Sequence, residues 1–418
     1  MIVVMTSGTP RPLDAVADQV RRAVDRLLAA ADTQAPDELP RAVADAAGEL
    51  GAADAVVHLA DLQQRQLVPL PPAGSQEPGA APLGVDSTLA GRAFQTLQPV
   101  SGAGPGERVQ LWLPLLDGSE RLGVLGLTVQ PGTALADEPA GLRAFASALA
   151  HLLVTRNLYG DALLRPRRSR PLTLAAEIQW SLLPPLTFSD RSVTVAGGME
   201  PAYEVAGDSF DYAVERGAAR FGVFDAMGHG IVSAQLINLV VAAYRNARRT
   251  GRTLRETADG IEEAVDLAFR VESFATGLLC HLDTDTGRLS WISAGHHAPL
   301  LLRAGRLVRE LAVEPLLPLG LNRGLDHTAE APVGTEQLEP GDLLLLYTDG
   351  VTEARSPAGE FFGRDRLVDL VSRHLAAGLP AAETVRRVVH ALIDHQAGDV
   401  VDDATLLLVQ WHGPPGAT

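Results

Sequence analysis

The chain has 418 residues, more than one ordinary hydrophobic core accommodates, so at least two domains are expected. Hydrophobic residues make up 46% of the chain and charged residues 21%, proportions typical of folded globular proteins and not of disordered chains. The formal net charge of -16 argues against a nucleic-acid-binding surface, which needs clustered positive charge.

No segment has the length and composition of a membrane span. The longest apolar helical stretch, Ile231 to Ala243, is interrupted by polar residues and is too short for a bilayer of about 30 Å. The opening MIVVM lacks the charged segment and the long apolar run of a signal peptide, so a cytoplasmic location is expected. A single cysteine, Cys280, excludes an internal disulfide and a cysteine-based metal cluster.

The first 164 residues have the element order of a small α+β domain. Apolar positions recur every three or four residues over Leu13–Ala31 and Pro40–Leu50, which predicts two helices. The segment 68–84 is rich in Pro and Gly and predicts a loop. Further expected elements are a strand at 54–60, a short helix ending at Gln95, strands at 109–115 and 122–129, and a helix over about 138–164.

The sequence RPRRSRP at 165–171 predicts a domain boundary, because Pro166 and Pro171 break helical hydrogen bonding. We interpret its four arginines as a solvated linker rather than a binding patch. The predicted organisation is a domain at 1–164, a linker containing a short helix at 165–190, and a second domain at 191–412.

From residue 193 onward, short β runs joined by turns alternate with helical segments, which favours antiparallel sheets covered by helices. The turn Asp285-Thr286-Gly287 between two alternating runs predicts a hairpin. Helices are expected at Ile231–Arg249, Leu254–Phe269, Arg364–Ala376 and Ala381–Gln396, and strands at 193–199, 219–224, 275–282, 288–293, 299–303, 342–347 and 404–411.

Five aspartates stand at the predicted ends of apolar runs in this second domain. A buried carboxylate without a partner costs on the order of several kcal/mol, so these clusters indicate a shared cation. Mg²⁺ and Mn²⁺ prefer such oxygen ligands. The five are Asp208 in VAGDSFDY (205–212), Asp225 in FGVFDAMGHG (221–230), Asp349 in LLLLYTDGVTEAR (343–355), and Asp402 and Asp403 in VVDDATLLLVQW (400–411).

Other chemistries lack the residues they need. There is no GxSxG nucleophile elbow with partners and no phosphate-binding P-loop, and the absence of any lysine argues against a kinase. We interpret His229, His296 and His297, which lie near glycine turns, as structural or solvated. Water activated by two cations about 3.5 to 4 Å apart, as in metal-dependent phosphoryl transfer, remains the chemistry that the aspartates favour.

The motifs resemble, in order and approximate spacing, those of metal-dependent serine/threonine protein phosphatases (the PPM family), in particular its SpoIIE-like and RsbU-like branch. They are VAGDSFDY, VFDAMGHG, SAGHHAPLLL, LYTDGVTEAR followed by EFFGRDRL, and DDATLLLV, over about residues 172 to 411. The resemblance implies an α/β/β/α sandwich of two antiparallel sheets flanked by helices. It also implies two Mn²⁺ or Mg²⁺ ions at one edge of that sandwich.

The resemblance also implies roles for the acids. Asp225 would bridge both ions, and the backbone carbonyl of Ala226 would reach one of them. Asp208 would support that second ion, while Asp349 and Asp402 would complete the first. Water held between the ions would attack phosphorus in line, and no phosphoenzyme would form.

The remaining residues of the motifs are expected to support the site. Asp403 is assigned to support because neighbouring strand residues point to opposite faces. Asp211 would orient the loop or a metal-bound water, and Gly228 and Gly230 would allow a tight turn before the helix at Ile231.

The N-terminal domain resembles a GAF sensory domain by its order of elements, and its ligand or partner is left open. The predicted helices near 138–164 and 172–183 could pair across a homodimer and couple this sensor to the catalytic domain. Pro166 and Pro171 interrupt a continuous helix between them.

The expected function is a phosphoserine/phosphothreonine protein phosphatase regulated by the N-terminal domain. By resemblance, its substrate would be a phosphorylated STAS-type anti-sigma-factor antagonist in a bacterial sigma-factor or stress-signalling pathway. The alternative is a catalytically weak or inactive, ligand-gated interaction protein that binds a phosphoprotein or an anti-sigma factor. The four principal acids, Asp208, Asp225, Asp349 and Asp402, are all present and favour the enzyme.

Overall fold

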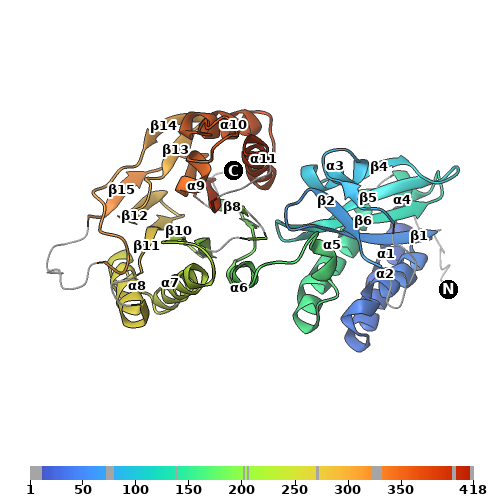
Figure 1. Cartoon of the computed structure of the whole chain (residues 1–418). Helices are drawn as coiled ribbons and strands as arrows, with labels where there is room; N and C mark the ends of the chain where they lie inside the picture. Colours follow the sequence, from blue (N-terminus) through green and yellow to red (C-terminus); the bar gives the residue numbers. More distant parts are fainter. Residues whose placement is uncertain are drawn as a thin grey trace, which may run out of the picture. The chain divides into compact units, whose positions relative to one another are not determined.

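The computed structural model describes residues 12–71, 80–137, 139–200, 203–204, 207–269, 273–321, 332–397 and 402–414. The chain divides into two compact units, Met1–Ser169 and Arg170–Thr418, within the arginine-rich segment 165–171 (Figure 1). None of the helices in the described ranges combines the length and the apolar character needed to cross a membrane.

The first unit is a six-stranded antiparallel sheet with the strand order β3-β2-β1-β6-β5-β4. Helices α1, α2 and α5 bury one face of this sheet, and α3 packs on the other through Phe94. The helices are α1 (Pro12–Thr33), α2 (Leu39–Glu49), α3 (Leu89–Thr96), α4 (Ala134–Asp137) and α5 (Arg143–Arg156), with single 3-10 turns at Pro36–Glu38, Pro139–Leu142, Asn157–Tyr159 and Arg165–Arg167. The strands are β1 (Asp54–Ala60), β2 (Gln66–Pro69), β3 (Leu83–Gly84), β4 (Val100–Ala103), β5 (Val109–Asp117) and β6 (Glu120–Val129).

Helix α5 is shorter than the helix predicted over about 138–164. A 3-10 turn, which begins at Pro139, precedes it, and the chain becomes extended at Gly160, where φ is 177°. The prediction of one helix reaching Leu164 is therefore wrong. The predicted loop 68–84 contains β3 and the end of β2, and its residues 72–79 lie outside the described ranges.

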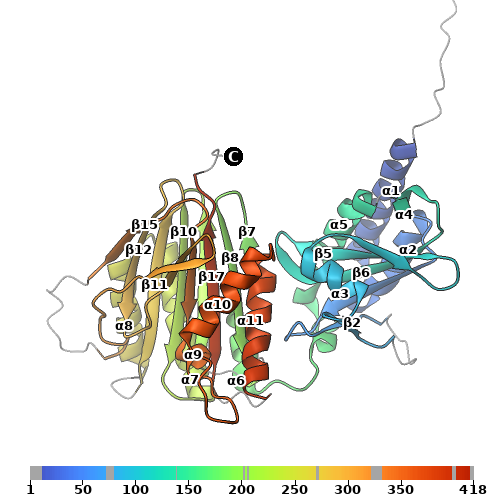
Figure 2. The same ribbon diagram turned by 90° about the horizontal axis from the view of Figure 1, so that it is seen from above.

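The second unit is a sandwich of two antiparallel sheets with helices on both outer faces (Figures 1 and 2). Its sheets have the strand orders β15-β12-β11-β10-β9 and β14-β13-β16-β17-β8-β7. Its helices are α6 (Leu174–Leu182), α7 (Ile231–Arg249), α8 (Leu254–Phe269), α9 (Asp349–Thr352), α10 (Arg364–Ala376) and α11 (Ala381–His395). Its strands are β7 (Thr187–Ser189), β8 (Val193–Glu200), β9 (Asp208–Glu215), β10 (Ala218–Ala226), β11 (Ala275–Asp283), β12 (Arg288–Ala294), β13 (Leu300–Arg303), β14 (Arg306–Glu310), β15 (Gly334–Gln337), β16 (Leu343–Tyr347) and β17 (Ala404–Trp411).

Alternating residues of the strands build separate cores on the two faces of each sheet. On β10, Phe221 and Val223 belong to the core between the sheets, whereas Phe224 packs with α7 and α8 on the outer face. The second sheet is covered on its outer face by α10 and α11. The predicted α/β/β/α sandwich is thus confirmed, and the alternation directs Asp225 toward the space between the sheets.

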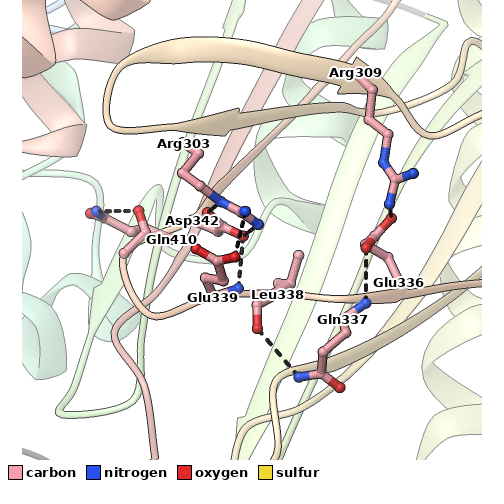
Figure 3. Close-up of polar contacts among 9 residues, drawn as sticks. Arg303, Arg309, Glu336, Gln337, Leu338, Glu339, Asp342 and Gln410 are labelled. Carbon is pink, nitrogen blue, oxygen red and sulfur yellow. Dashed lines mark hydrogen bonds and ion pairs between the residues drawn. The ribbon is translucent and has the colours of Figure 1, made fainter.

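At the end of the sandwich where β16 begins, the buried carboxylate of Asp342 is neutralised by an arginine (Figure 3). The guanidinium of Arg303 donates to both Asp342 oxygens at 2.8 Å and to Oε1 of Glu339 at 2.6 Å. An ion pair of Arg309 with Glu336 joins β14 to β15 nearby. This pairing is what burial of a carboxylate normally requires, and it contrasts with the other end of β16.

Candidate metal centre

Two aspartates lie side by side on neighbouring strands of the sandwich's first sheet, β15-β12-β11-β10-β9. Asp208 is the first residue of β9, and Asp225 is the last but one of β10; the two are direct cross-strand partners. The alternation that places Phe210 and Val223 in the core between the sheets also directs these two carboxylates there. Like charges directly opposite each other destabilise an antiparallel pair, so this position calls for compensation.

Three further aspartates come from the second sheet. Asp349 follows the end of β16 by two residues, and Asp402 with Asp403 immediately precedes β17. Because β16 and β17 are antiparallel neighbours, the end of one and the start of the other lie at the same edge. Three of the five acids, including Asp208, therefore stand at the start of a strand and not at its end.

The acids are close enough to raise one another's pKa. Burial, together with the charges of Asp349, Asp402 and Asp403, raises the pKa of Asp225 to about 7. The pKa of Asp208 is raised well above its usual value by burial first and then by Asp225 and Asp403. Within the described ranges, no arginine or histidine forms an ion pair with Asp208, Asp225, Asp349 or Asp402.

The donor set fits a hard divalent cation. All the side-chain donors are carboxylate oxygens, the ligands that Mg²⁺ and Mn²⁺ prefer. In the described part of the chain, no three His, Cys, Asp or Glu side chains are grouped closely enough to hold a cation by themselves. A Mg²⁺ ion typically takes one or two carboxylates and completes its shell with water, which matches an arrangement of facing acids and not a closed cage.

The turn after β10 brings backbone groups to the same edge. The N–H of Ala226 donates to the carbonyl of Gly207 at 2.9 Å, and the Ala226 carbonyl accepts a long hydrogen bond of 3.4 Å from Ser233. Gly228 and Gly230 have φ values of 87° and 82°, which L side chains rarely adopt. The chain therefore turns after the end of β10 at Ala226, and α7 begins at Ile231, directly after Gly230.

Asp403 ties the two sheets together. Its Oδ2 accepts a hydrogen bond of 2.5 Å from the N–H of Gly207, the residue before Asp208. Gly350 lies against the same segment, since a Cβ atom there would be 1.8 Å from the carbonyl oxygen of Asp403. A supporting role for Asp403 agrees with this geometry, and Asp402 beside it is the exposed member of the pair.

The structure does not bring Asp211 to this edge. Three residues beyond Asp208, its side chain lies on the opposite face of β9, under α7, and is 1% exposed. Its Oδ1 accepts from Arg245 at 2.7 Å and its Oδ2 from Arg248 at 2.7 Å. Both oxygens are committed, so the predicted role in orienting the loop or a metal-bound water is corrected: Asp211 fastens α7 to β9.

Thr348 is a site residue that the sequence analysis missed. Its buried hydroxyl donates to Oδ2 of Asp208 at 2.6 Å and accepts from the N–H of Thr405 at 2.9 Å. It therefore fixes the carboxylate of one sheet to the backbone of the other. Thr348 directly precedes Asp349 in the motif LYTDG, and that position was the available signal.

His296 holds the end of β16, directly before Thr348, through a buried hydrogen bond. Its Nε2 donates to the carbonyl of Tyr347 at 3.2 Å, and its Nδ1 accepts from the hydroxyl of Thr276 at 2.8 Å. Burial and the neighbouring His297 lower the pKa of His296 to about 3, so it stays neutral. This arrangement fits the structural interpretation of that histidine.

Comparison with known proteins finds similar sequences and structures for this part of the chain. Residues 215–412 match the family described as stage II sporulation protein E (SpoIIE). The chain is 23% identical over 239 residues to phosphoserine phosphatase RsbU of Bacillus subtilis (strain 168), covering 57% of this chain and 69% of RsbU. It is 32% identical over 137 residues to protein IcfG of Synechocystis sp., covering 32% of this chain but 20% of IcfG.

Among solved structures, the SiaA-PP2C domain of Pseudomonas aeruginosa aligns with a TM-score of 0.46 and 21% identity, covering 56% of this chain and 94% of that domain. The sequence match to the SpoIIE family covers residues 215–412, which lie in the second unit. The resemblance inferred from the motifs is confirmed for this region, while a GAF identity of the first unit stays a prediction.

Replacing Thr348 by Val should destabilise the candidate metal centre. The change keeps the side-chain volume but leaves Asp208 and the Thr405 N–H without this partner, at a cost of about 1 to 3 kcal/mol in the free energy of unfolding. Urea denaturation of the second unit measures the loss. Thr348→Ser, which keeps the hydroxyl, should retain most of the stability; an equal loss in both variants would contradict the bridging role.

Without divalent cations, the protein should lose stability as pH rises. The folded-state pKa of Asp225 is raised to about 7 from an ordinary 3.8, so the folded state binds more protons between these values. The free energy of unfolding therefore falls as pH increases from about 4 through 7. Thermal unfolding in a chelator should show this slope, and Asp225→Asn should flatten it; an unchanged slope in the variant would show that other groups cause it.

Proposed function

We propose that the chain is a metal-dependent phosphoserine/phosphothreonine protein phosphatase. The observation that carries this proposal is the acidic edge, where Asp208 and Asp225 of one sheet face Asp349 and Asp402 near the other, and no described arginine or histidine forms an ion pair with them. The SpoIIE family match over 215–412 and the name phosphoserine phosphatase of the relative RsbU support the same activity.

In this proposal the acids hold two Mn²⁺ or Mg²⁺ ions. Asp225 is the cross-strand partner of Asp208, and its pKa is raised by burial and also by Asp349 and Asp402 near the other sheet. It is therefore the best placed to contact both ions, with the Ala226 carbonyl beside it. Asp208 would serve one ion, and Asp349 and Asp402 the other. When bound, the cations supply an activated water and neutralise charge on the phosphoryl group.

The substrate proposed is a phosphorylated STAS-type anti-sigma-factor antagonist in a bacterial sigma-factor pathway. Its support is the resemblance to the RsbU-like branch and the match to the SpoIIE family. The charges of the site agree with a phosphorylated side chain only when cations are present, because a phosphate dianion would otherwise meet several carboxylates.

A phosphate-release assay tests the activity. With Mn²⁺ and a serine-phosphorylated STAS-domain protein, the full chain should release phosphate, and Asp225→Ala and Asp349→Ala should each lower the rate at least about 100-fold, since they remove proposed ligands. Asp365→Ala is the matched control, because this side chain on α10 is fully exposed. Undiminished phosphate release by both site variants would exclude the proposed mechanism.

The alternative, an interaction protein without activity, is separated from the enzyme by metal binding. A site that has lost its function should show no tight Mn²⁺ binding when measured by calorimetry, whereas a site with all four acids should bind Mn²⁺. If Mn²⁺ binds but no phosphoprotein is hydrolysed, the substrate assignment fails and the metal centre stands.

We also propose that the first unit regulates the second. Residues 170–418 form a compact unit by themselves, so they can be produced without the first unit. Their specific activity should then differ from that of the full chain toward the same phosphoprotein. Identical rates and identical oligomeric mass for the two proteins would leave regulation and dimerisation by the first unit without support.

A further inference from the structure

A cavity of about 380 Å³ lies in the second unit, on the outer face of the sheet that contains β10, β11 and β12, away from the acidic edge. It is enclosed by the C-terminal end of α7, the turn that follows, and the N-terminal end of α8. Cavities of this size are typical of sites for small organic ligands. Arg220 on its floor is five residues before Asp225 on β10, about 17 Å along the strand and on the opposite face.

The floor of the cavity is a row of hydrogen-bond donors. Arg220, His281 and Ser290 are consecutive cross-strand partners on β10, β11 and β12. Further along, the same face of the sheet is apolar and is packed under α7 and α8. The sheet thus changes from an apolar to a polar surface where the helices leave the cavity open.

The charges around the cavity are all positive. Four arginines, Arg220, Arg248, Arg252 and Arg255, line it together with His281, and among the residues that the structure describes no Asp or Glu does, in a chain of net charge -16. Two of these arginines have their own carboxylates: Arg248 pairs with Asp211 and Arg255 with Asp259. For Arg220 and Arg252, no ion pair with a carboxylate is found among the described residues.

Among the described residues, Arg220 donates to two neutral acceptors, Nδ1 of His281 at 3.3 Å and the carbonyl of Arg248 at 3.2 Å. Within the described ranges, the guanidinium of Arg252 forms no hydrogen bond or ion pair; Glu256 accepts hydrogen bonds from Thr253 at the start of α8, which lower its pKa, and the charge of Arg252 helps to lower it. Two guanidinium charges are therefore left for a ligand, which matches a dianion.

His281 adds a donor and not a third charge. Its pKa is lowered by burial first and then by Arg220, so the ring is neutral near pH 7. Because Nδ1 accepts from Arg220, the proton of the neutral ring is on Nε2. The side chains of Tyr244, Leu254 and Val333 supply an apolar part of the lining.

From these observations we propose that the cavity binds a small organic phosphate, a dianionic phosphate monoester carried on an apolar group. The phosphate lies between Arg220 and Arg252, where planar guanidinium groups offer paired donors. The apolar group lies against Tyr244 and Leu254. This site is separate from the proposed metal centre and has no part in holding its cations.

Calorimetry on the full chain in a chelator tests the site, with benzylphosphonate as a probe that is not hydrolysed. One molecule should bind per chain, inorganic phosphate should bind more weakly, and benzyl alcohol should not bind. Arg252→Gln should weaken benzylphosphonate binding about tenfold, and the double variant Arg220→Gln, Arg252→Gln about 100-fold, since each charged hydrogen-bond donor contributes about that factor.

Arg249→Gln is the matched control. Arg249 is an exposed arginine on the last turn of α7, next to the cavity residue Arg248, but it does not line the cavity. Its affinity for benzylphosphonate should equal that of the unchanged chain. Absence of saturable binding, equal affinity in Arg252→Gln, or an equal loss in Arg249→Gln would overturn the proposal. Inorganic phosphate binding as tightly as benzylphosphonate would overturn the apolar half of the ligand.

Discussion

The repulsion among aspartates at one end of the sandwich is the constraint on which the site depends. Asp208 and Asp225 are direct partners on β9 and β10, and acids next to β16 and β17 face them from the second sheet. Elsewhere in this unit the fold neutralises buried acids with arginine, as Arg303 does for Asp342 and Arg245 and Arg248 do for Asp211. At this edge no described arginine pairs with the acids, so protons or cations from solvent must offset their repulsion, at a cost to stability that a binding function explains.

Holding these charges together requires rigid supports from both sheets. Thr348 joins the Asp208 carboxylate to the backbone of β17, and Asp403 joins β17 to the segment before β9. Gly350 allows the turn after β16 to approach the Asp403 carbonyl, where any side chain would collide with it. The acids are therefore fixed by core strands, and a cation would need little rearrangement of the backbone to bind there.

The sandwich and the main acids were predictable because both leave strong local patterns. Apolar runs next to Asp225 and Asp349 mark buried strands, and the order of motifs is specific where each motif alone is not. Hydrogen bonds between side chains of different sheets leave no such pattern in the sequence. Thr348 and Asp208 form a hydrogen bond although they are 140 residues apart in the sequence. Asp211 lies on the same strand as Asp208 but on the opposite face of β9. The end of α5 was missed because the apolar pattern of the sequence continues past Gly160, whereas the helix ends before this residue and the backbone there is extended.

Strand β10 explains how one small sheet carries acids and bases without mutual neutralisation. Asp225 and Arg220 are separated by five residues, an odd number, so their side chains lie on opposite faces. Between them, Phe221 and Val223 fill the core between the sheets, and Phe224 fills the core under α7. The apolar residues keep the two charged regions apart by both distance and a low-dielectric layer. Asp211 reinforces this separation, because it pairs with Arg245 and Arg248 on the outer face, away from the acids of the candidate metal centre. The edge therefore keeps its negative charge, which the proposed cations would neutralise, and the outer face keeps Arg220 and Arg252, which the proposed anion would contact.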